Sequence, residues 1–277
     1  QQSRLSLVDS SIKTNAANGV LLENALIDVL RCAVDANGIH GLYGHDNSAA
    51  TVTDATITRH PDDGVLLTNS SGDFLRTTIG QGAAHGIDTD VAAVVMADSD
   101  VVENATHGIH LVNSTADLTD SRLVGNQANG ISATDSTASI ISCTISDQGA
   151  EGLLLANSAA GLESTTIERS GGSGLSAANS VAAFDGGAIR DNGSHGLSLL
   201  KSSIDAVDLE VSGNAGSGVY AMSSGIGFVD CTVTDNAVKV KDLGSRNCIR
   251  VNGQKTREAT LEHGDELSLG DVRLLFK

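Results

Sequence analysis

Residues 108–130 read GIHLVNSTADLTDSRLVGNQANG and hold one complete unit of a repeat that runs along most of the chain. The unit opens with a glycine and an aliphatic residue, Gly108-Ile109, and the next unit opens 22 residues later with Gly130-Ile131. A fixed period of this length is typical of repeat architectures, in which each unit packs only on its neighbours. The same pair returns at Gly19-Val20, Gly41-Leu42, Gly64-Val65, Gly86-Ile87, Gly152-Leu153, Gly174-Leu175, Gly196-Leu197 and Gly218-Val219, with one irregular step of 23 residues after Gly41.

Apolar and polar residues alternate inside each unit, as in ADLTDSRL at 116–123. A period of two is typical of short β-strands and not of helices. Apolar columns recur one, ten and fifteen residues after the glycine, so each unit sends about three stripes inward. We therefore expect an all-β chain whose residues 1–237 form a right-handed, three-faced parallel β-helix of about ten coils, similar to the pectin-lyase-like β-helix proteins.

Asparagine fills two further columns, which we expect to form turns. Asn tolerates the left-handed backbone conformation and bonds to nearby backbone groups, and stacked Asn side chains can bond to one another along a rod. Five residues after the glycine stand Asn24, Asn69, Asn113, Asn157 and Asn179, with Asp135 in the same row; eighteen after it stand Asn15, Asn37, Asn104, Asn126, Asn192, Asn214 and Asn236.

The composition is acidic and poor in aromatic residues. With 34 acidic against 17 basic residues, the formal net charge is -17, which disfavours nucleic acid and anionic membranes as partners. No apolar run is long enough to insert into a membrane. Aromatic residues make up 2% of the chain and Trp is absent, so a long polysaccharide groove is less expected than in a typical secreted β-helix. We expect an extracellular or cell-surface location.

Three of the four cysteines share one inward column. Cys32, Cys143 and Cys231 each lie thirteen residues after their glycine and are separated by five and four coils. At about 4.8 Å per coil they are too far apart for a disulfide, which needs Cα atoms within about 7 Å. Cys248 lies beyond the repeat and could reach Cys231.

The repeat ends after Val233, and a different pattern follows it. The segment 240–254 reads VKDLGSRNCIRVNGQ, and 259–276 reads ATLEHGDELSLGDVRLLF. These residues resemble the C-terminal half of a forkhead-associated (FHA) domain, with matches at DLGSRN, VNG, HGD and LG. The resemblance implies a small antiparallel half β-sandwich over residues 238–277, which we expect to cap the rod because an open coil exposes strand edges and core.

The same resemblance implies a phosphothreonine-peptide site that this chain holds only in part. Ser245, Arg246 and Asn247 match peptide-contacting loop positions of the family. The family's phosphate-binding Gly-Arg and Ser-x-x-His motifs are missing, and Cys248-Ile249 replaces Gly-Thr in the loop. A peptide site would therefore need a partner chain that carries the missing FHA half.

The first coil offers an open edge. Leu5, Leu7 and Ile12 continue the inward columns at the start of the sequence. An open edge is a template for another chain, so we expect a non-enzymatic rod that assembles end to end with copies of itself through this coil and the FHA-like tail. Two alternatives stay open: a phosphothreonine-peptide binding module completed by another chain, and a polysaccharide lyase or depolymerase.

The lyase alternative depends on one charged face. Asp98, Asp100, Asp120 and Arg122 flank an inward position on neighbouring coils, so their side chains are expected to point outward together. Three carboxylates could hold Ca²⁺, and Arg122 could act as the base, as in pectate-lyase-like β-helices. Solvated ladder ion pairs are the simpler interpretation, so we expect no cofactor, with Ca²⁺ as the one candidate.

Histidines stand next to the glycine in several coils. His85 and His107 are neighbours in the stack, about 5 Å apart, and His110 follows three residues after His107. A zinc site is conceivable there. No Cys or carboxylate joins these imidazoles at a convincing spacing, so we interpret them as turn residues and expect no metal site.

Overall fold

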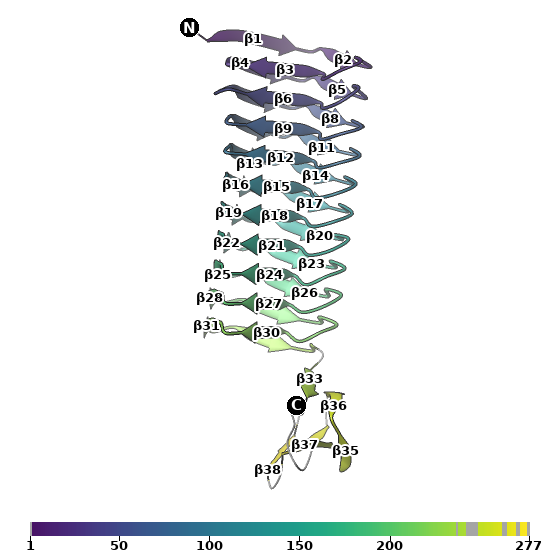
Figure 1. Ribbon diagram of the computed structural model, residues 1–277, viewed down its shortest axis with the longest axis vertical. Helices are drawn as coiled ribbons and strands as arrows, with labels where there is room; N and C mark the ends of the chain where they lie inside the picture. The colour runs from purple at the N-terminus through teal and green to yellow at the C-terminus, as the bar shows by residue number, and fades with distance from the viewer. Residues whose placement is uncertain (1, 237, 242–248, 262–264, 270–271, 276–277) are drawn as a thin grey trace.

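The computed structural model describes residues 2–236, 238–241, 249–261, 265–269 and 272–275. The chain winds into a straight stack of coils, with each coil contributing one strand to each side of the rod (Figure 1). The first sheet has eleven strands: β1 (Ser3–Val8), β4 (Ala25–Leu30), β7 (Ala49–Thr53), β10 (Ser71–Leu75), β13 (Ala93–Ala97), β16 (Thr115–Thr119), β19 (Thr137–Ile141), β22 (Ala159–Glu163), β25 (Val181–Asp185), β28 (Ser203–Val207) and β31 (Gly225–Val229).

Two more parallel sheets close the coil. The second has eleven strands: β2 (Ser11–Lys13), β5 (Ala33–Asp35), β8 (Thr56–Thr58), β11 (Thr78–Gly80), β14 (Asp100–Val102), β17 (Arg122–Val124), β20 (Thr144–Ser146), β23 (Thr166–Glu168), β26 (Ala188–Arg190), β29 (Glu210–Ser212) and β32 (Thr232–Thr234). The third has ten: β3 (Val20–Glu23), β6 (Leu42–His45), β9 (Val65–Thr68), β12 (Ile87–Asp90), β15 (Ile109–Val112), β18 (Ile131–Thr134), β21 (Leu153–Ala156), β24 (Leu175–Ala178), β27 (Leu197–Leu200) and β30 (Val219–Met222).

The strand register follows the sequence period. Ile109 pairs with Ile131 in the third sheet, and Leu118 pairs with Ile140 in the first, each across 22 residues. The inward columns are buried: Ile109, Leu118 and Leu123 expose at most 1% of their surface. The expected fold class is confirmed, with eleven coils in two of the sheets where about ten were expected.

The two asparagine columns form the turns, as expected. Asn113 and Asn157 have positive φ angles of 49° and 51°, the left-handed conformation that Asn tolerates. In the buried column, Nδ2 of Asn104 donates to Oδ1 of Asn126 at 2.9 Å, and Asn126 continues to Gln148 at 3.1 Å. This ladder satisfies buried polar groups between the coils.

The glycine column exists because the coils meet there at close range. A Cβ atom placed on Gly130 would lie 2.5 Å from Cγ2 of Ile145 and 2.6 Å from the carbonyl oxygen of Gly152 in the next coil. Both distances are far below van der Waals contact, so any larger residue would push the coils apart.

The tail forms small antiparallel sheets. β33 (Val238–Lys241) pairs with β36 (Glu258–Leu261), and a second sheet runs in the order β35 (Gln254–Thr256), β34 (Ile249–Val251), β37 (Glu266–Leu269) and β38 (Val272–Leu275). Asn252 and Gly253 have positive φ angles of 51° and 78° and turn β34 into β35. Asn-Gly is the favoured pair for such two-residue hairpins.

The last coil of the rod is not covered by the tail in the way that the sequence led us to expect. Ile226 and Val233 belong to the inward columns of the last coil, yet they are 41% and 44% exposed. Their partners one coil earlier, Ile204 and Val211, are fully buried. The tail follows the rod as a separate small unit (Figure 1), so the described part of the tail leaves this end of the core open.

The cysteine column agrees with the sequence. Cys32 and Cys143 are buried free thiols and Cys231 is a half-buried free thiol. Burial raises the pKa of the Cys143 thiol, as expected for a core residue. Cys248, the possible partner of Cys231, lies outside the described residues.

Candidate functional sites

Both ends of the rod present apolar surface. Leu5, in the edge strand β1, is 48% exposed, whereas Leu7 and Ile12 are partly buried against the core. The inward-pointing side chains of the first coil are therefore only partly exposed to solvent. At the other end, Ile226 and Val233 are more exposed than the corresponding residues of any inner coil, because no following coil packs on them.

Exposed apolar side chains gather toward these ends. Two lie in the middle of the rod, at Val91 and Val95. The others among the described residues lie in the first two coils or the last three: Leu5, Val8, Leu21, Ile39, Val181, Leu200, Val207, Tyr220, Met222, Ile226, Val229 and Val233. Apolar surface concentrated in one place is typical of a contact with another chain.

The charged face predicted for a lyase forms an ion-pair ladder. Arg122 donates to both carboxylate oxygens of Asp100, at 2.8 and 3.1 Å, and this contact raises the pKa of the guanidinium. Asp98 and Asp120 have positive φ angles of 49° and 48°, so they are turn residues. The same one-coil pairing joins Arg31 to Asp9, Arg76 to Asp54 and Arg169 to Asp147.

This repetition indicates that the pair is part of the rod's surface pattern. Arg122 is engaged by a carboxylate and its pKa is raised, so it is poorly suited to act as a base. The groups of three metal-ligating residues found among the described residues lie elsewhere and do not include Asp98, Asp100 or Asp120. This geometry gives the Ca²⁺ and lyase hypotheses no support.

Replacing Asp100 by Ala is expected to have a small effect. The carboxylate is 31% exposed and its Arg122 partner is 62% exposed. Exposed ion pairs contribute about 0.2–1 kcal/mol, and less at high salt. Urea unfolding of Asp100→Ala at low and high salt should therefore show a loss below about 1 kcal/mol. A much larger loss, insensitive to salt, would show that Asp100 has a role beyond this ladder.

The predicted peptide-contacting residues Ser245, Arg246 and Asn247 lie outside the described residues. Nearby, the structure joins two of the motif pieces: Nδ2 of Asn252 donates to Oδ1 of Asp265 at 2.6 Å. The likeness to an FHA domain stays a prediction.

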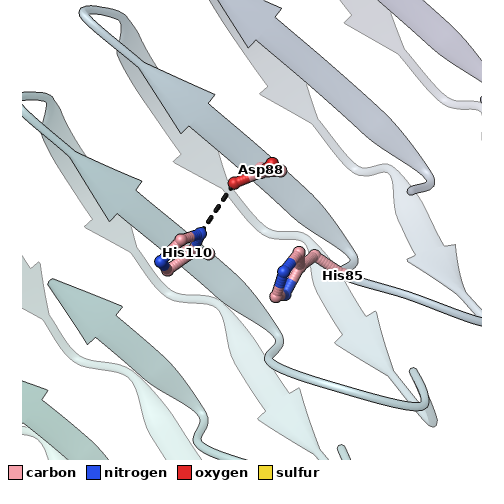
Figure 2. Close-up of side chains that lie close together, drawn as sticks. All are labelled: His85, Asp88 and His110. Carbon is pink, nitrogen blue, oxygen red and sulfur yellow. Dashed lines mark hydrogen bonds and ion pairs between the residues drawn. The ribbon is translucent and has the colours of Figure 1, made fainter. Parts of the chain in front are cut away.

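A cluster of two histidines and one aspartate lies on the outer face of the third sheet (Figure 2). The register of β12 and β15 places Asp88 directly beside His110, and the two side chains bond through Oδ1 and Nδ1 at 2.8 Å. His85 comes from the turn before β12, and its ring stacks on that of His110 with centroids 4.9 Å apart. One ligand atom from each residue lies within 4.8 Å of the others, so the cluster could hold a metal ion.

The electrostatics of this cluster keep Asp88 ionised. Burial acts to raise the pKa of Asp88, but the hydrogen bond from His110 and the charges of His85 and His110 outweigh it and lower the pKa. Burial lowers the pKa of His85. It also lowers the pKa of the neighbouring His107 to about 4, with help from the other two histidines. The imidazoles of His85 and His107 are therefore neutral at pH 7, the form that binds metals.

A second cluster lies beside the first, formed by His40, Asp62 and Asp63. Asp63 is buried, and its Oδ1 accepts the backbone N–H of His85 at 2.9 Å. Its Oδ2 lies 3.4 Å from Nδ1 of His40, a buried atom that makes no hydrogen bond of good geometry. Burial raises the pKa of Asp63 to about 7 and lowers that of His40.

The carboxylate of the first cluster was not predicted from the sequence. In the column of His85 and His107, the residue before each glycine, Asp63 stands one coil before His85 and Asn129 one coil after His107. Asp88 stands two residues after its glycine, in the column of His110, and the spacing of one coil between them was the available signal. The expectation of turn histidines without a carboxylate partner is therefore wrong for His110.

Comparison with known families agrees with this architecture. The family described as "Right handed beta helix region" matches residues 1–141 and 129–263, which together span most of the chain. The chain belongs to this family. No curated protein sequence matches the chain.

Solved structures similar to this right-handed β-helix include two mutants of the periplasmic alginate epimerase AlgG. They align with TM-scores of 0.52 and 0.54 at 12% and 11% identity, covering 84% of this chain and 73% of the epimerase. Pectate lyase Pel9A aligns with a TM-score of 0.49 at 11% identity, covering 85% of this chain and 70% of the lyase. At such low identity the likeness shows the fold alone. Among the described residues, no helix is long and apolar enough to cross a membrane.

Proposed function

We propose that this right-handed β-helix is a non-enzymatic structural rod, acting outside the cell or at its surface, that associates end to end with further copies of itself. One observation carries the proposal: exposed apolar side chains gather toward the two ends of the rod, including the inward residues Ile226 and Val233 of the last coil. Burying such residues is the main favourable contribution to association.

The geometry of the two ends also favours a second copy as the partner. All strands of the rod run parallel, and β31 presents to the next molecule the same edge that β28 presents to β31. The edge of β1 is the matching surface at the other end. If the tail moves aside from its place beyond the last coil (Figure 1), a head-to-tail contact would continue the sheets in register. Head-to-tail contacts that do not close on themselves give filaments.

The tail provides a second surface for contact with other chains in this proposal. We propose that residues 238–277 form an FHA-like interaction module beyond the last coil. The bond between Asn252 and Asp265 favours it, because it links the Val-Asn-Gly and His-Gly-Asp motif pieces in an antiparallel sheet. A phosphothreonine peptide bound with a partner's FHA half remains the second candidate function.

The double variant Ile226→Asp, Val233→Asp tests the association. Two carboxylates on the apolar end would have to be desolvated in the contact, and two aliphatic side chains would lose their burial, at about 1.5–3 kcal/mol each. We expect association measured by sedimentation equilibrium to weaken at least about 100-fold. Val95→Asp is the matched control, because Val95 is 44% exposed in the middle of the rod.

Two results would contradict the proposal. A chain that stays monomeric at high concentration has no end-to-end contact. A Val95→Asp variant that dissociates as much as the double variant would place the contact on the side of the rod. Far-UV circular dichroism should show that both variants keep their β-structure.

A further inference from the structure

The repeat provides an internal comparison that sets Asp88 and His110 apart. Both stand two residues after the glycine, at an outward position of the third sheet. In the coils on either side of this pair, the same position carries an aliphatic residue or serine, at Leu66 and Ser132. In the remaining coils it is again uncharged: Leu21, Tyr43, Leu154, Ser176, Ser198 and Tyr220. The fold therefore does not require a carboxylate and an imidazole here.

We propose that His85, Asp88 and His110 form a binding site for one Zn²⁺ ion on the side of the rod. In His110, Nδ1 faces Oδ1 of the ionised Asp88 at 2.8 Å, and a carboxylate can only accept a hydrogen bond, so Nδ1 carries the proton. A zinc ion between these two atoms would replace that proton, with Nδ1 of His110 as its first ligand and the ring proton on Nε2.

His85 can supply the second nitrogen. Its Nδ1 lies 2.7 Å from the hydroxyl oxygen of Thr106, which can accept a proton from the ring as well as donate one. The backbone N–H of His107 donates to the same Nδ1 at 3.4 Å. Metal binding through Nε2 therefore requires the ring proton of His85 to move from Nε2 to Nδ1, where the hydroxyl oxygen of Thr106 accepts it in place of the contact with His107. A carboxylate oxygen of Asp88 is the third ligand.

The ligand set and spacing favour zinc. Two imidazoles and a carboxylate suit Zn²⁺, whereas Ca²⁺ takes oxygen ligands. Ligand atoms around a tetrahedral zinc ion stand about 3.4 Å apart, given bonds of about 2.1 Å. The three ligand atoms here lie within 4.8 Å of one another, so modest side-chain rotations close the site. All three side chains are half-buried, which leaves a position open to water.

His107 lies beside this site but is not a ligand. Its ring stacks on His85 and on His110, with centroids 5.1 and 5.5 Å away. Its Nδ1 accepts the backbone N–H of Asn129 at 3.1 Å, so the proton of the neutral ring stands on Nε2. In the neighbouring coils, the side-chain oxygens of Asp63 and Asn129 accept backbone N–H groups of the following coil in the same way. His107 therefore forms a wall of the site.

The site is independent of rod association, because it lies on the fourth and fifth coils and away from both ends. Its surroundings favour a cation: the charges of Asp62 and Asp88 act on His85, and the whole chain carries a net charge of -17. A negative surface raises the local concentration of cations.

Calorimetric titration of the full chain with ZnCl₂ at pH 7.5, after treatment with EDTA, tests the proposal. We expect one ion per chain with micromolar affinity, His110→Gln to weaken binding at least about tenfold, and Asp88→Asn to weaken it about 10–100-fold. His45→Gln is the matched control. His45 also contacts an aspartate, Asp46, at 3.0 Å, but it lies outside the cluster of His85, Asp88 and His110. This variant should bind as the wild type does. Co²⁺ should give the visible absorption bands of a tetrahedral site in the wild type and lose them in His110→Gln.

Three outcomes would overturn the proposal. They are no zinc binding by the wild-type chain, equal zinc binding by His85→Gln/His110→Gln, and binding of Ca²⁺ but not Zn²⁺. Circular dichroism checks that the variants are folded. Asp88→Asn keeps the shape of the side chain, so it tests the site even if the histidine variants fold poorly.

Discussion

Replacing Asp63 by Asn should stabilise the chain at pH 8 by about 2–4 kcal/mol, since one pKa unit corresponds to about 1.4 kcal/mol. Burial raises the pKa of Asp63 from 3.8 to about 7, so at pH 8 the folded chain must hold a buried carboxylate. Asn has no charge, can still accept the backbone N–H of His85, and can donate to Nδ1 of His40, which lacks a good hydrogen bond. The substitution removes a desolvation penalty and satisfies a buried acceptor.

The pH dependence gives a second signature of Asp63. Between about pH 4 and pH 7 the folded chain keeps a proton on Asp63 that the unfolded chain has released. The free energy of unfolding should therefore fall as the pH rises through this window and level off above it. In Asp63→Asn this contribution is absent, so the advantage of the variant should shrink toward pH 4.

Urea unfolding with EDTA present, at pH 5 and pH 8, measures both effects. Asp62→Asn is the control, because it removes the same charge from the exposed neighbouring residue. A variant Asp63→Asn that is less stable than the wild type at pH 8 would show that Asp63 is an ionised partner of a charged His40.

Replacing Gly130 by Ala should destabilise the chain by about 3 kcal/mol, the upper end of the usual cost of overpacking. The new methyl group would overlap a side-chain methyl of Ile145 and the backbone oxygen of Gly152. This oxygen belongs to the backbone, so it cannot move away by a change of side-chain rotamer. It also accepts the N–H of Ile131 at 3.0 Å, and a shift would break that bond. The strain therefore falls on the contact between two coils.

The control for this substitution is another glycine of the rod. Gly161 is exposed in β22, and a Cβ atom there meets nothing within 4 Å. Gly161→Ala should be neutral or slightly stabilising in the same urea titration, because alanine has fewer unfolded conformations than glycine. Equal losses for the two variants would show that the glycine column does not set the distance between the coils.

Most of the rod could be predicted from the sequence, because the repeat determines which residues pair between neighbouring strands and which side chains point inward. Once Gly108 and Gly130 are aligned, every residue at the same offset occupies the same position one coil further along. The Asn turns and the pairing of Asp100 with Arg122 follow from that rule. Predicting these two features does not require knowing how side chains of different columns contact one another.

The remaining features depend on contacts between columns or at the ends. The ring of His85 reaches His110 across two different columns, which the bend of the chain before β12 brings together. No offset rule describes that contact. The open end at Ile226 and Val233 was also not predicted, since the tail has no repeat from which its position could be read.

Negative-stain electron microscopy of the purified chain over a range of concentrations tests the end-to-end proposal most directly. Eleven coils at about 4.8 Å give a rod of about 50 Å. We expect particles several rod lengths long at high concentration, and single rods in the Ile226→Asp, Val233→Asp variant. Single rods of the wild-type chain at every concentration would contradict the account.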